Sequence, residues 1–390
     1  MFSDRIGRIT PSATLAMTAK AAELRAAGVD VINLSVGEPD FPTPTNIREA
    51  GKKAIDTGHT RYTPGGGTMD LKKAAAEKMA RDNDLHYKPE EILISCGGKH
   101  ALYNACQVLF QAGDEVIIFA PYWVSFPDFV AVTGAKPIFV NTDSCLQFEP
   151  NFDDLKSKIT SRTRGMIINS PSNPTGGVWG DGALLKVLEL ARDIDAWIFS
   201  DECYEQLTYD QPYVSTAILA KNNDKVLTFQ SCSKTYAMTG WRIGYTAGDR
   251  DVIKAMGKLQ GQSTSCPNSI AQMAAIEALT GDQSEVGRMR VEFKKRRDYI
   301  VDRLNSMIGV NCSTPGGAFY VFPDFSAYMD QDRKITCSND LSMYLLEKKS
   351  VVTVSGDAFG GEGHVRFSYA ASDDHLRCAM DLVEETLNEI

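Results

Sequence analysis

From about residue 91 onward, short and almost wholly apolar runs alternate with stretches that have helical periodicity, such as 99–111 and 182–193. Short apolar runs are typical of strands buried on both faces, and helical segments between them are typical of crossover connections. The alternation therefore predicts an α/β fold in which helices flank a large, mostly parallel sheet. The seven expected strands are 92–94, 115–119, 137–140, 165–168, 197–199, 226–229 and 243–247.

The pattern changes after residue 281, which indicates a second structural unit. One long amphipathic helix, 282–307, is followed by short apolar runs and by a closing helix at 373–388. Residues 41–281 are expected to form the large domain. Residues 1–40 are too few to form a core of their own. We expect them to pack on residues 282–390 and to form a smaller α/β domain with them.

Charge and cysteine usage exclude several classes of function. The formal net charge is -9, and the longest basic cluster is the short run 294–297, so no nucleic-acid partner is expected. The nine cysteines are scattered singly, which predicts neither a disulfide framework nor a metal site. Residues 1–10 lack the apolar core of a signal peptide, and no apolar run is long enough to span a membrane. A cytoplasmic protein without a membrane partner is expected.

The segment 230–244, which follows the expected strand 226–229, contains Lys234 among small hydroxyl residues and Arg242 eight positions later. A lysine amine condenses with an aldehyde once burial or nearby charge lowers its pKa, whereas an arginine binds phosphate as a rigid fork. The pair suits an aldehyde that carries a phosphate. A lysine after a strand is usually a solvated surface residue, so this interpretation depends on the other loops.

Two further loops could contribute to the same site. Gly97 and Gly98 lie between an expected strand and an expected helix, where free backbone N–H groups and the helix dipole favour an anion. A glycine pair at such a turn is also common for purely structural reasons. Asn173 precedes a proline after another buried strand, so its backbone is extended and its amide can face a cleft.

Asp201 lies two residues after the expected strand 197–199, at the end of this buried segment. A carboxylate there is costly unless it meets a cation, and the protonated ring nitrogen of pyridoxal is such a cation. A helix N-cap is an equally good explanation for this aspartate taken alone.

Together these motifs resemble those of the fold-type I, class I aminotransferases, which depend on pyridoxal 5'-phosphate, and above all those of bacterial aspartate aminotransferases. The similarity runs from about residue 11 to the C-terminus. The matching segments are GEPDF at 37–41, Tyr62, GGK at 97–99, PYW at 121–123, NPTG at 173–176, DECY at 201–204, SCSK at 231–234, GWRIG at 240–244 and Arg366.

The resemblance implies that Lys234 binds the cofactor as a Schiff base and moves the proton at the substrate α-carbon. It implies that Asp201 pairs with the ring nitrogen, that Tyr204 and Asn173 bind the ring oxygen, and that Trp123 stacks on the ring. The catalytic residues implied are Lys234, Asp201 and Tyr204. The cofactor-binding residues implied are Gly98, Lys99, Trp123, Asn173, Asp201, Tyr204, Ser231, Ser233, Lys234 and Arg242, with Tyr62 reaching the phosphate from the neighbouring subunit of a homodimer.

The same resemblance implies a substrate. Arg366 is similar to the arginine that clamps the α-carboxylate. In one subgroup of the family, an arginine of the partner subunit binds the distal carboxylate of the substrate. This chain has Gln-Gly-Gln at 260–262, where that arginine would fall. Lys99, Ser12 and Thr14 match the residues that do this in the other bacterial subgroup. The substrate-binding residues implied are Gly37, Lys99, Trp123, Asn173, Arg366, Ser12 and Thr14.

We therefore expect ping-pong transfer of the amino group from L-aspartate to 2-oxoglutarate, which gives oxaloacetate and L-glutamate. A second departure, Phe126 in place of a histidine found in some relatives, is expected to affect only cofactor tuning. Prephenate is a further dicarboxylate that Lys99 would suit. Aromatic or kynurenine aminotransferases and carbon-sulfur β-lyases on the same fold stay open as alternatives.

Two classes outside this chemistry are disfavoured. A nicotinamide-dependent oxidoreductase would need a glycine-rich fingerprint followed by an acidic residue, and the chain has none. A regulatory module that has lost catalysis usually carries a DNA-binding domain. Only about ten residues precede the matched region, so we do not expect one.

Overall fold

The computed structural model describes residues 2–11, 13–330 and 335–389. Its main feature is a sheet with the strand order β2-β9-β8-β7-β6-β3-β4-β5. Strands β3, β4, β6, β7 and β8 are parallel, and β9 runs antiparallel to β8 and β2. The strands are β2 (Ile92–Ser95), β3 (Glu115–Ala120), β4 (Lys136–Asp143), β5 (Glu149–Pro150), β6 (Thr163–Asn169), β7 (Trp197–Asp201), β8 (Lys225–Ser231) and β9 (Gly244–Ala247).

The predicted α/β fold is confirmed, with one correction to the strand count. All seven predicted strands are present, but the sheet has eight, because the two-residue strand β5 pairs antiparallel with β4. Two residues are too few to produce a recognisable alternation of apolar and polar positions.

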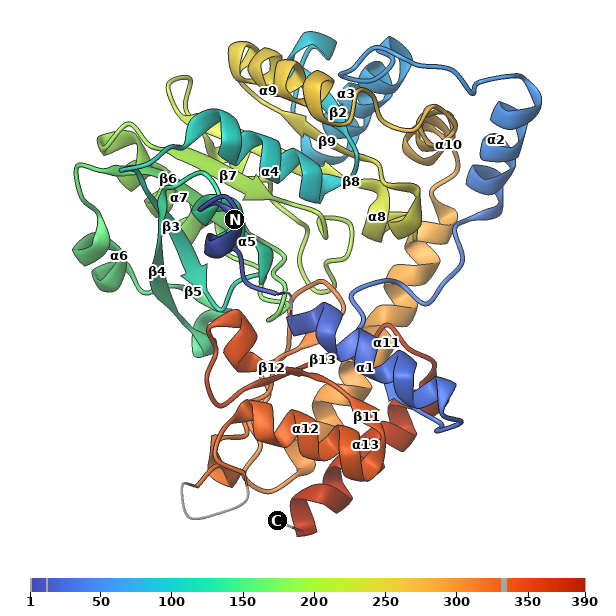
Figure 1. Cartoon of the computed structure of the whole chain (residues 1–390), viewed down its shortest axis with the longest axis vertical. Helices are drawn as coiled ribbons and strands as arrows, with labels where there is room; N and C mark the ends of the chain where they lie inside the picture. Colours follow the sequence, from blue (N-terminus) through green and yellow to red (C-terminus); the bar gives the residue numbers. More distant parts are fainter. Residues whose placement is uncertain (1, 12, 331–334, 390) are drawn as a thin grey trace.

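Helices cover both faces of this sheet (Figure 1). Ile167 of β6 packs in the core beneath α4, α5 and α9, whereas its neighbours Met166 and Ile168 pack on the opposite face against α7. Burial on both faces explains why the strands read as continuous apolar runs. The helices of this unit are α2 (Thr45–Asp56), α3 (Met69–Asn83), α4 (Gly98–Leu109), α5 (Ser125–Ala131), α6 (Phe152–Lys158), α7 (Asp181–Asp193), α8 (Cys232–Thr235), α9 (Arg250–Ser263) and α10 (Ser269–Thr280).

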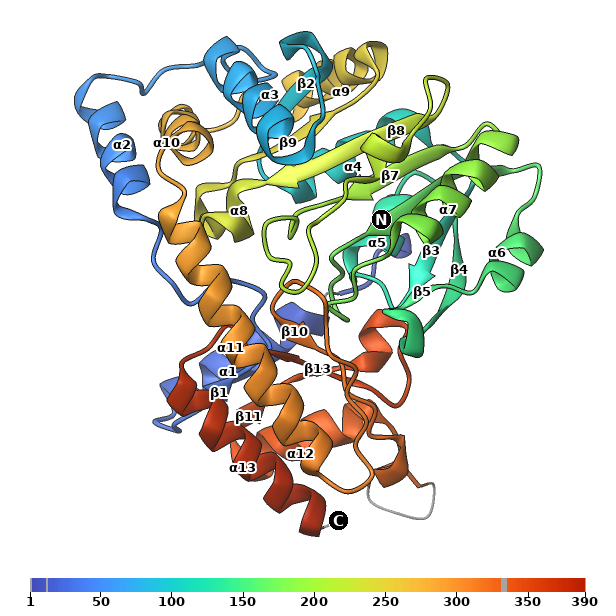
Figure 2. The same ribbon diagram turned by 180° about the vertical axis from the view of Figure 1, so that it is seen from behind.

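Helix α11 (Ser284–Ser306) leads from the large sheet to a second unit, as both views of the ribbon show (Figures 1 and 2). This unit contains the antiparallel sheet β10-β13-β12, and the N-terminal strand β1 pairs in parallel with β11. The domain boundaries at residues 41 and 281 stay a prediction. The remaining elements are α1 (Ala13–Ala26), β1 (Ile32–Asn33), β10 (Tyr320–Val321), α12 (Ser338–Lys349), β11 (Val351–Val352), β12 (Val354–Ser355), β13 (Val365–Ser368) and α13 (Asp373–Glu389).

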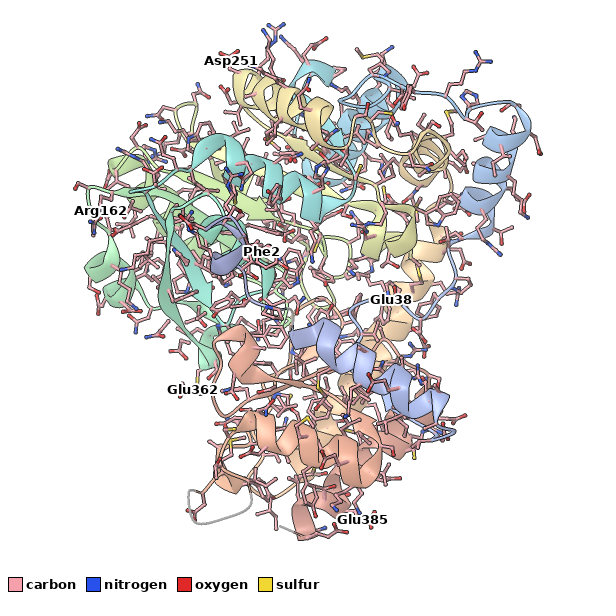
Figure 3. All side chains as sticks on the ribbon, in the orientation of Figure 1. Phe2, Glu38, Arg162, Asp251, Glu362 and Glu385 are labelled. Carbon is pink, nitrogen blue, oxygen red and sulfur yellow. The ribbon has the colours of Figure 1, made fainter. Side chains whose placement is uncertain are left out.

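The segment that joins the N-terminal residues to the large unit passes between the two units. Glu38 lies on this segment where the units meet (Figure 3). Its carboxylate accepts a hydrogen bond of 2.8 Å from the hydroxyl of Thr239, which begins a short 3-10 helix, Thr239–Trp241, after α8. Across the described part of the chain, no helix combines the length and the apolar character that a membrane span needs.

Candidate active site

The carboxyl ends of β6, β7 and β8 and the first turn of α4 open onto one cavity of about 340 Å³. Ligands of open α/β sheets bind at this edge of the strands. Most of the residues predicted from the sequence meet here. They are Gly37, Gly98, Lys99, Trp123, Asn173, Asp201, Tyr204, Ser231, Ser233, Lys234, Arg242 and Arg366.

Three predicted residues are not among those that line the cavity. Tyr62 is 90% exposed, on the segment between α2 and α3. Thr14 belongs to α1, but its side chain is not described, and Ser12 lies outside the described residues. Their predicted contacts with cofactor or substrate stay predictions.

Lys234 lies on the short helix α8, directly after β8. The Ser231 hydroxyl begins this helix by accepting a hydrogen bond of 3.1 Å from the Ser233 N–H. The Lys234 Nζ atom donates a hydrogen bond to the Gly37 carbonyl. Burial lowers the pKa of Lys234 to about 8, and the positive charge of Arg242 contributes to this decrease. A lysine with such a pKa keeps a sizeable neutral, nucleophilic fraction near physiological pH.

Asp201 ends β7 and is 5% exposed. Burial raises its pKa to about 7, and the neighbouring Glu202 carboxylate adds to the increase. The Cys203 N–H donates to the Asp201 Oδ1 atom over 3.3 Å, so Asp201 caps a turn, and no helix begins there. A buried carboxylate that faces a cavity is strongly stabilised by a cation that enters it.

The turn before α4 forms a cradle together with Arg242. Gly97 has a φ of +89°, and a Cβ atom there would lie 2.3 Å from the Arg242 Nη2 atom. A Cβ atom on Gly244 would lie 2.4 Å from the Gly98 nitrogen. Glycine is therefore required at 97 and at 244 for the guanidinium and the helix N-terminus to come this close. Backbone N–H groups beside a guanidinium form a site for an anion such as phosphate.

Arg366 of β13 is 2% exposed at another wall of the cavity. Its Nη1 atom donates to Asn173 Oδ1 over 2.7 Å and its Nη2 atom to the Ser35 carbonyl over 2.6 Å. The buried Nε atom has no hydrogen-bond partner within the described residues. The Tyr320 ring lies 4.6 Å from the guanidinium carbon. A buried guanidinium with a free donor suits a carboxylate ligand.

Lys99 brings a further cation to the cavity, since its Nζ atom lies over the Trp123 ring, 5.0 Å from the centroid. Burial lowers the pKa of Lys99, and the charge of Arg242 lowers it further. Phe126 is buried and packs edge-on against Trp123 with ring centroids 5.3 Å apart.

Several residues of the cavity were not predicted from the sequence. The Tyr320 hydroxyl lies 2.9 Å from the Tyr204 hydroxyl, but Tyr320 belongs to one of the short apolar runs after residue 307, to which no role in the site was assigned. Asn169 binds the Asp201 carbonyl through its amide, and its polar character at a strand end was a usable signal. The other residues are Leu102, Val124, Ser125, Cys203 and Thr239, for which local sequence gave no signal.

Comparisons with known proteins agree with this geometry. The family described as aminotransferase class I and II matches residues 29–381. Aspartate/prephenate aminotransferase of Cereibacter sphaeroides is 46% identical over 382 residues, which are 96% of each chain. Aspartate aminotransferase of Geobacillus stearothermophilus is 46% identical over 97% of each chain. The structure of aspartate aminotransferase from Thermus thermophilus with maleate has a TM-score of 0.94, 40% identity and 99% coverage of each chain. The chain therefore belongs to the class I and II aminotransferase family.

Proposed function

We propose that this chain is a pyridoxal-phosphate-dependent aspartate aminotransferase, which transfers the amino group of L-aspartate to 2-oxoglutarate and yields oxaloacetate and L-glutamate. The observation that carries the proposal is the cavity itself, in which Lys234 lies among an anion cradle, a buried carboxylate and the buried Arg366. The relatives named aspartate aminotransferase support the choice of donor.

The residues of the cavity fit pyridoxal phosphate. The backbone of Gly98 and Lys99 and the side chains of Ser231, Ser233 and Arg242 would hold the phosphate, because they line the cradle that glycine at 97 and 244 keeps open. When bound, the cofactor supplies an electron sink for the negative charge that develops at the substrate α-carbon.

The remaining contacts with the cofactor would come from side chains on the strand ends. Asp201 would pair with the ring nitrogen, and this cation would compensate for the burial that raises the pKa of the carboxyl. Asn173 and Tyr204 would bind the ring oxygen, and Trp123 would stack on the ring. All four residues line the same cavity.

Lys234 would first anchor the cofactor and would then move a proton. Its amine accepts the α-carbon proton only when neutral, and a pKa of about 8 provides that form near physiological pH. The Gly37 carbonyl, which accepts a hydrogen bond from Nζ, orients the amine in the cavity.

Two cations would select a dicarboxylate substrate. Arg366 would bind the α-carboxylate through the N–H groups of its guanidinium. Among these is Nε, which has no hydrogen-bond partner within the described residues. Lys99 would bind the distal carboxylate, with help from Ser12 and Thr14 of the N-terminal segment. A relative was solved with maleate, itself a dicarboxylate, which supports this assignment.

We further propose a homodimer in the cytoplasm. Tyr62 is almost fully exposed in the single chain, as expected for a side chain that completes the active site of a partner subunit. The nine cysteines are free, in agreement with a reducing compartment.

Prephenate is the second candidate substrate, as amino acceptor. The observation that favours it is the relative named aspartate/prephenate aminotransferase, at 46% identity over nearly the whole chain. Prephenate carries two carboxylates, so the same pair of cations, Arg366 and Lys99, would bind it.

A transamination panel tests the donor and the acceptor together. We expect fast transfer from aspartate to 2-oxoglutarate or prephenate and slower transfer from alanine or phenylalanine. In Lys99→Ala the aspartate rate should fall about ten- to a hundredfold, since a charge-assisted hydrogen bond is lost, while alanine turnover changes little. Lys99→Arg, which keeps the charge, should retain part of the preference.

Equal losses for aspartate and alanine in Lys99→Ala would contradict the proposed role of Lys99. Release of pyruvate and ammonia from cystathionine, without oxaloacetate from aspartate, would instead identify a carbon-sulfur β-lyase.

A further inference from the structure

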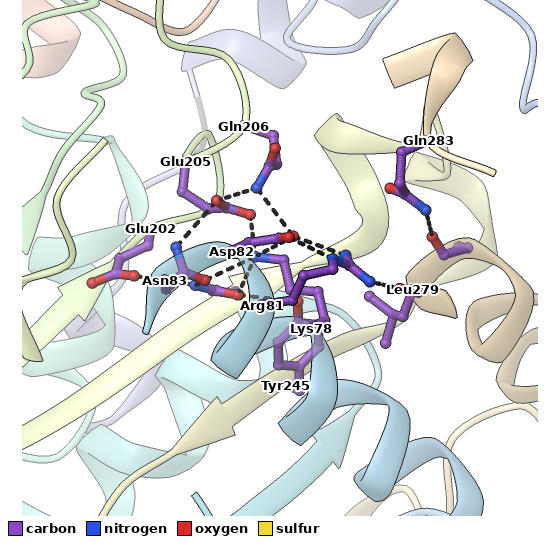
Figure 4. A network of polar contacts seen from close by, with 12 residues as sticks. Lys78, Arg81, Asp82, Asn83, Glu202, Glu205, Gln206, Tyr245, Leu279 and Gln283 are labelled. Atoms are coloured by element: carbon purple, nitrogen blue, oxygen red, sulfur yellow. Dashed lines mark hydrogen bonds and ion pairs between the residues drawn. The ribbon is translucent and has the colours of Figure 1, made fainter. Parts of the chain in front are cut away.

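Lys78 of α3 is a buried cation that the proposed reaction does not use. Its side chain is 1% exposed, and its Nζ atom donates to Asn83 Oδ1 over 3.0 Å and to the Glu205 carboxylate (Figure 4). The third acceptor is Gln230 Oε1 at 2.9 Å, and the Asp82 carboxylate lies farther away, at 3.8 Å. Three acceptors match the three protons of an ammonium group. Lys78 is therefore held as a charged group within the protein.

Lys78 determines which way the Gln230 amide points. The Gln230 oxygen accepts from Lys78 and, over 3.1 Å, from the Tyr245 hydroxyl. The amide nitrogen therefore does not face the ammonium group, and it donates to Glu202 Oε2 over 3.2 Å and to Asn83 Oδ1 over 3.1 Å. Asn83 Oδ1 also accepts from Lys78, so the same ammonium group supports this orientation of the amide through both acceptors. If the amide were reversed, its oxygen would face the Glu202 carboxylate and its nitrogen would face the ammonium group.

Glu202 is a fully buried carboxylate surrounded by donors. Besides Gln230, the hydroxyls of Ser200 and Ser215 donate to its Oε1 atom over 2.9 and 2.7 Å. Burial raises the pKa of Glu202, and these three hydrogen bonds oppose the increase. The donors stabilise the ionised form, because an ionised carboxylate only accepts hydrogen bonds.

This network lies directly behind the candidate active site. Glu202 follows Asp201 in the chain, and Gln230 precedes Ser231. Consecutive residues of an extended segment point to opposite sides, so Asp201 and Ser231 face the cavity while Glu202 and Gln230 face the network. The Glu202 N–H also donates to the Phe229 carbonyl, which fixes this carboxylate relative to β8.

We propose that Lys78 is a positioning residue that, acting through Gln230, holds Glu202 as a buried anion behind Asp201 and so strengthens the attraction between Asp201 and the protonated ring nitrogen of the cofactor. The inference rests on the proposed function. A second negative charge beside a carboxylate increases the proton affinity of the group that the carboxylate binds.

Two test variants and one control separate this role from that of a simple counter-ion. Lys78→Met alone would leave Glu205 buried and unpaired, which destabilises the fold. Lys78→Met combined with Glu205→Gln removes the two charges of the Lys78–Glu205 pair at similar side-chain size. Glu202→Gln directly removes the negative charge that lies behind Asp201. Lys73→Met makes the same lysine change at an exposed position of the same helix and serves as the control.

The readout is the ¹⁵N chemical shift of the ring nitrogen in holoenzyme that is reconstituted with ¹⁵N-labelled pyridoxal phosphate. We expect the double variant and Glu202→Gln both to move this shift toward the value of unprotonated pyridine, while Lys73→Met matches the wild type. Identical shifts in the wild type and in both network variants would overturn the inference and leave the proposed function intact. A wild type that binds no labelled cofactor would overturn both.

Discussion

Replacement of Lys234 by alanine should lower the rate of transamination from aspartate by about 10⁴-fold. The cavity would lose the amine that we propose as the anchor of the cofactor and as the base that takes the α-carbon proton. Arg366 and the phosphate cradle remain, so the variant should still bind substrate and phosphate. The steady-state rate of oxaloacetate formation and the visible spectrum, recorded on the same preparation, measure both effects.

Lys221→Ala is the matched control, because Lys221 is an exposed lysine at the surface. It should leave both the rate and the spectrum as in the wild type. A Lys234→Ala variant with an unchanged visible band and a rate within tenfold of the wild type would reject the assignment.

Replacement of Asp201 by asparagine should lower the same rate by about a thousandfold. Loss of one partner of a buried charge pair costs about 3–5 kcal/mol, which corresponds to a factor of about 10²–10³ or more. The amide keeps the size of the side chain but cannot stabilise a positive ring nitrogen. The rate and the affinity for pyridoxal phosphate should therefore both decrease.

Asp193→Asn is the control for that change, because Asp193 is an exposed aspartate at the end of α7. Asp201→Glu, which retains the charge on a longer side chain, should recover part of the lost rate. If Asp201→Asn kept the activity of the wild type, the ring nitrogen would need another partner and the proposed orientation of the cofactor would be wrong.

Much of the fold could be predicted from the sequence for a simple physical reason. In β6, Met166 and Ile168 enter one core and Ile167 enters the other, so these three consecutive positions must all be apolar. Such runs stand out in any sequence. The strand β5 has only two residues at the edge of the sheet and leaves no comparable pattern.

The candidate site was predictable where polar residues interrupt these runs. Asp201 is the last residue of β7, and Lys234 lies in α8, directly after β8. The order of the strands brings both residues into one cavity. Tyr320 could not be recognised, because an aromatic residue within an apolar run looks like any other core residue. Its contact with Tyr204 joins positions that are 116 residues apart.

The Lys78 network was invisible for a related reason. A lysine in a helix normally indicates a solvated surface, and only the fold shows that Asn83, Glu205 and Gln230 surround this amine. The role proposed for Tyr62 depends on a second subunit, which the pattern of one chain does not describe.

The most direct test of the central claim is to locate the cofactor on the chain. The holoenzyme is reduced with sodium borohydride, which makes the link between the cofactor and a lysine amine permanent, and its peptides are analysed by mass spectrometry. The account predicts the pyridoxyl group on Lys234. Modification of Lys99, which lines the same cavity, in place of Lys234, or no modified lysine at all, would contradict it.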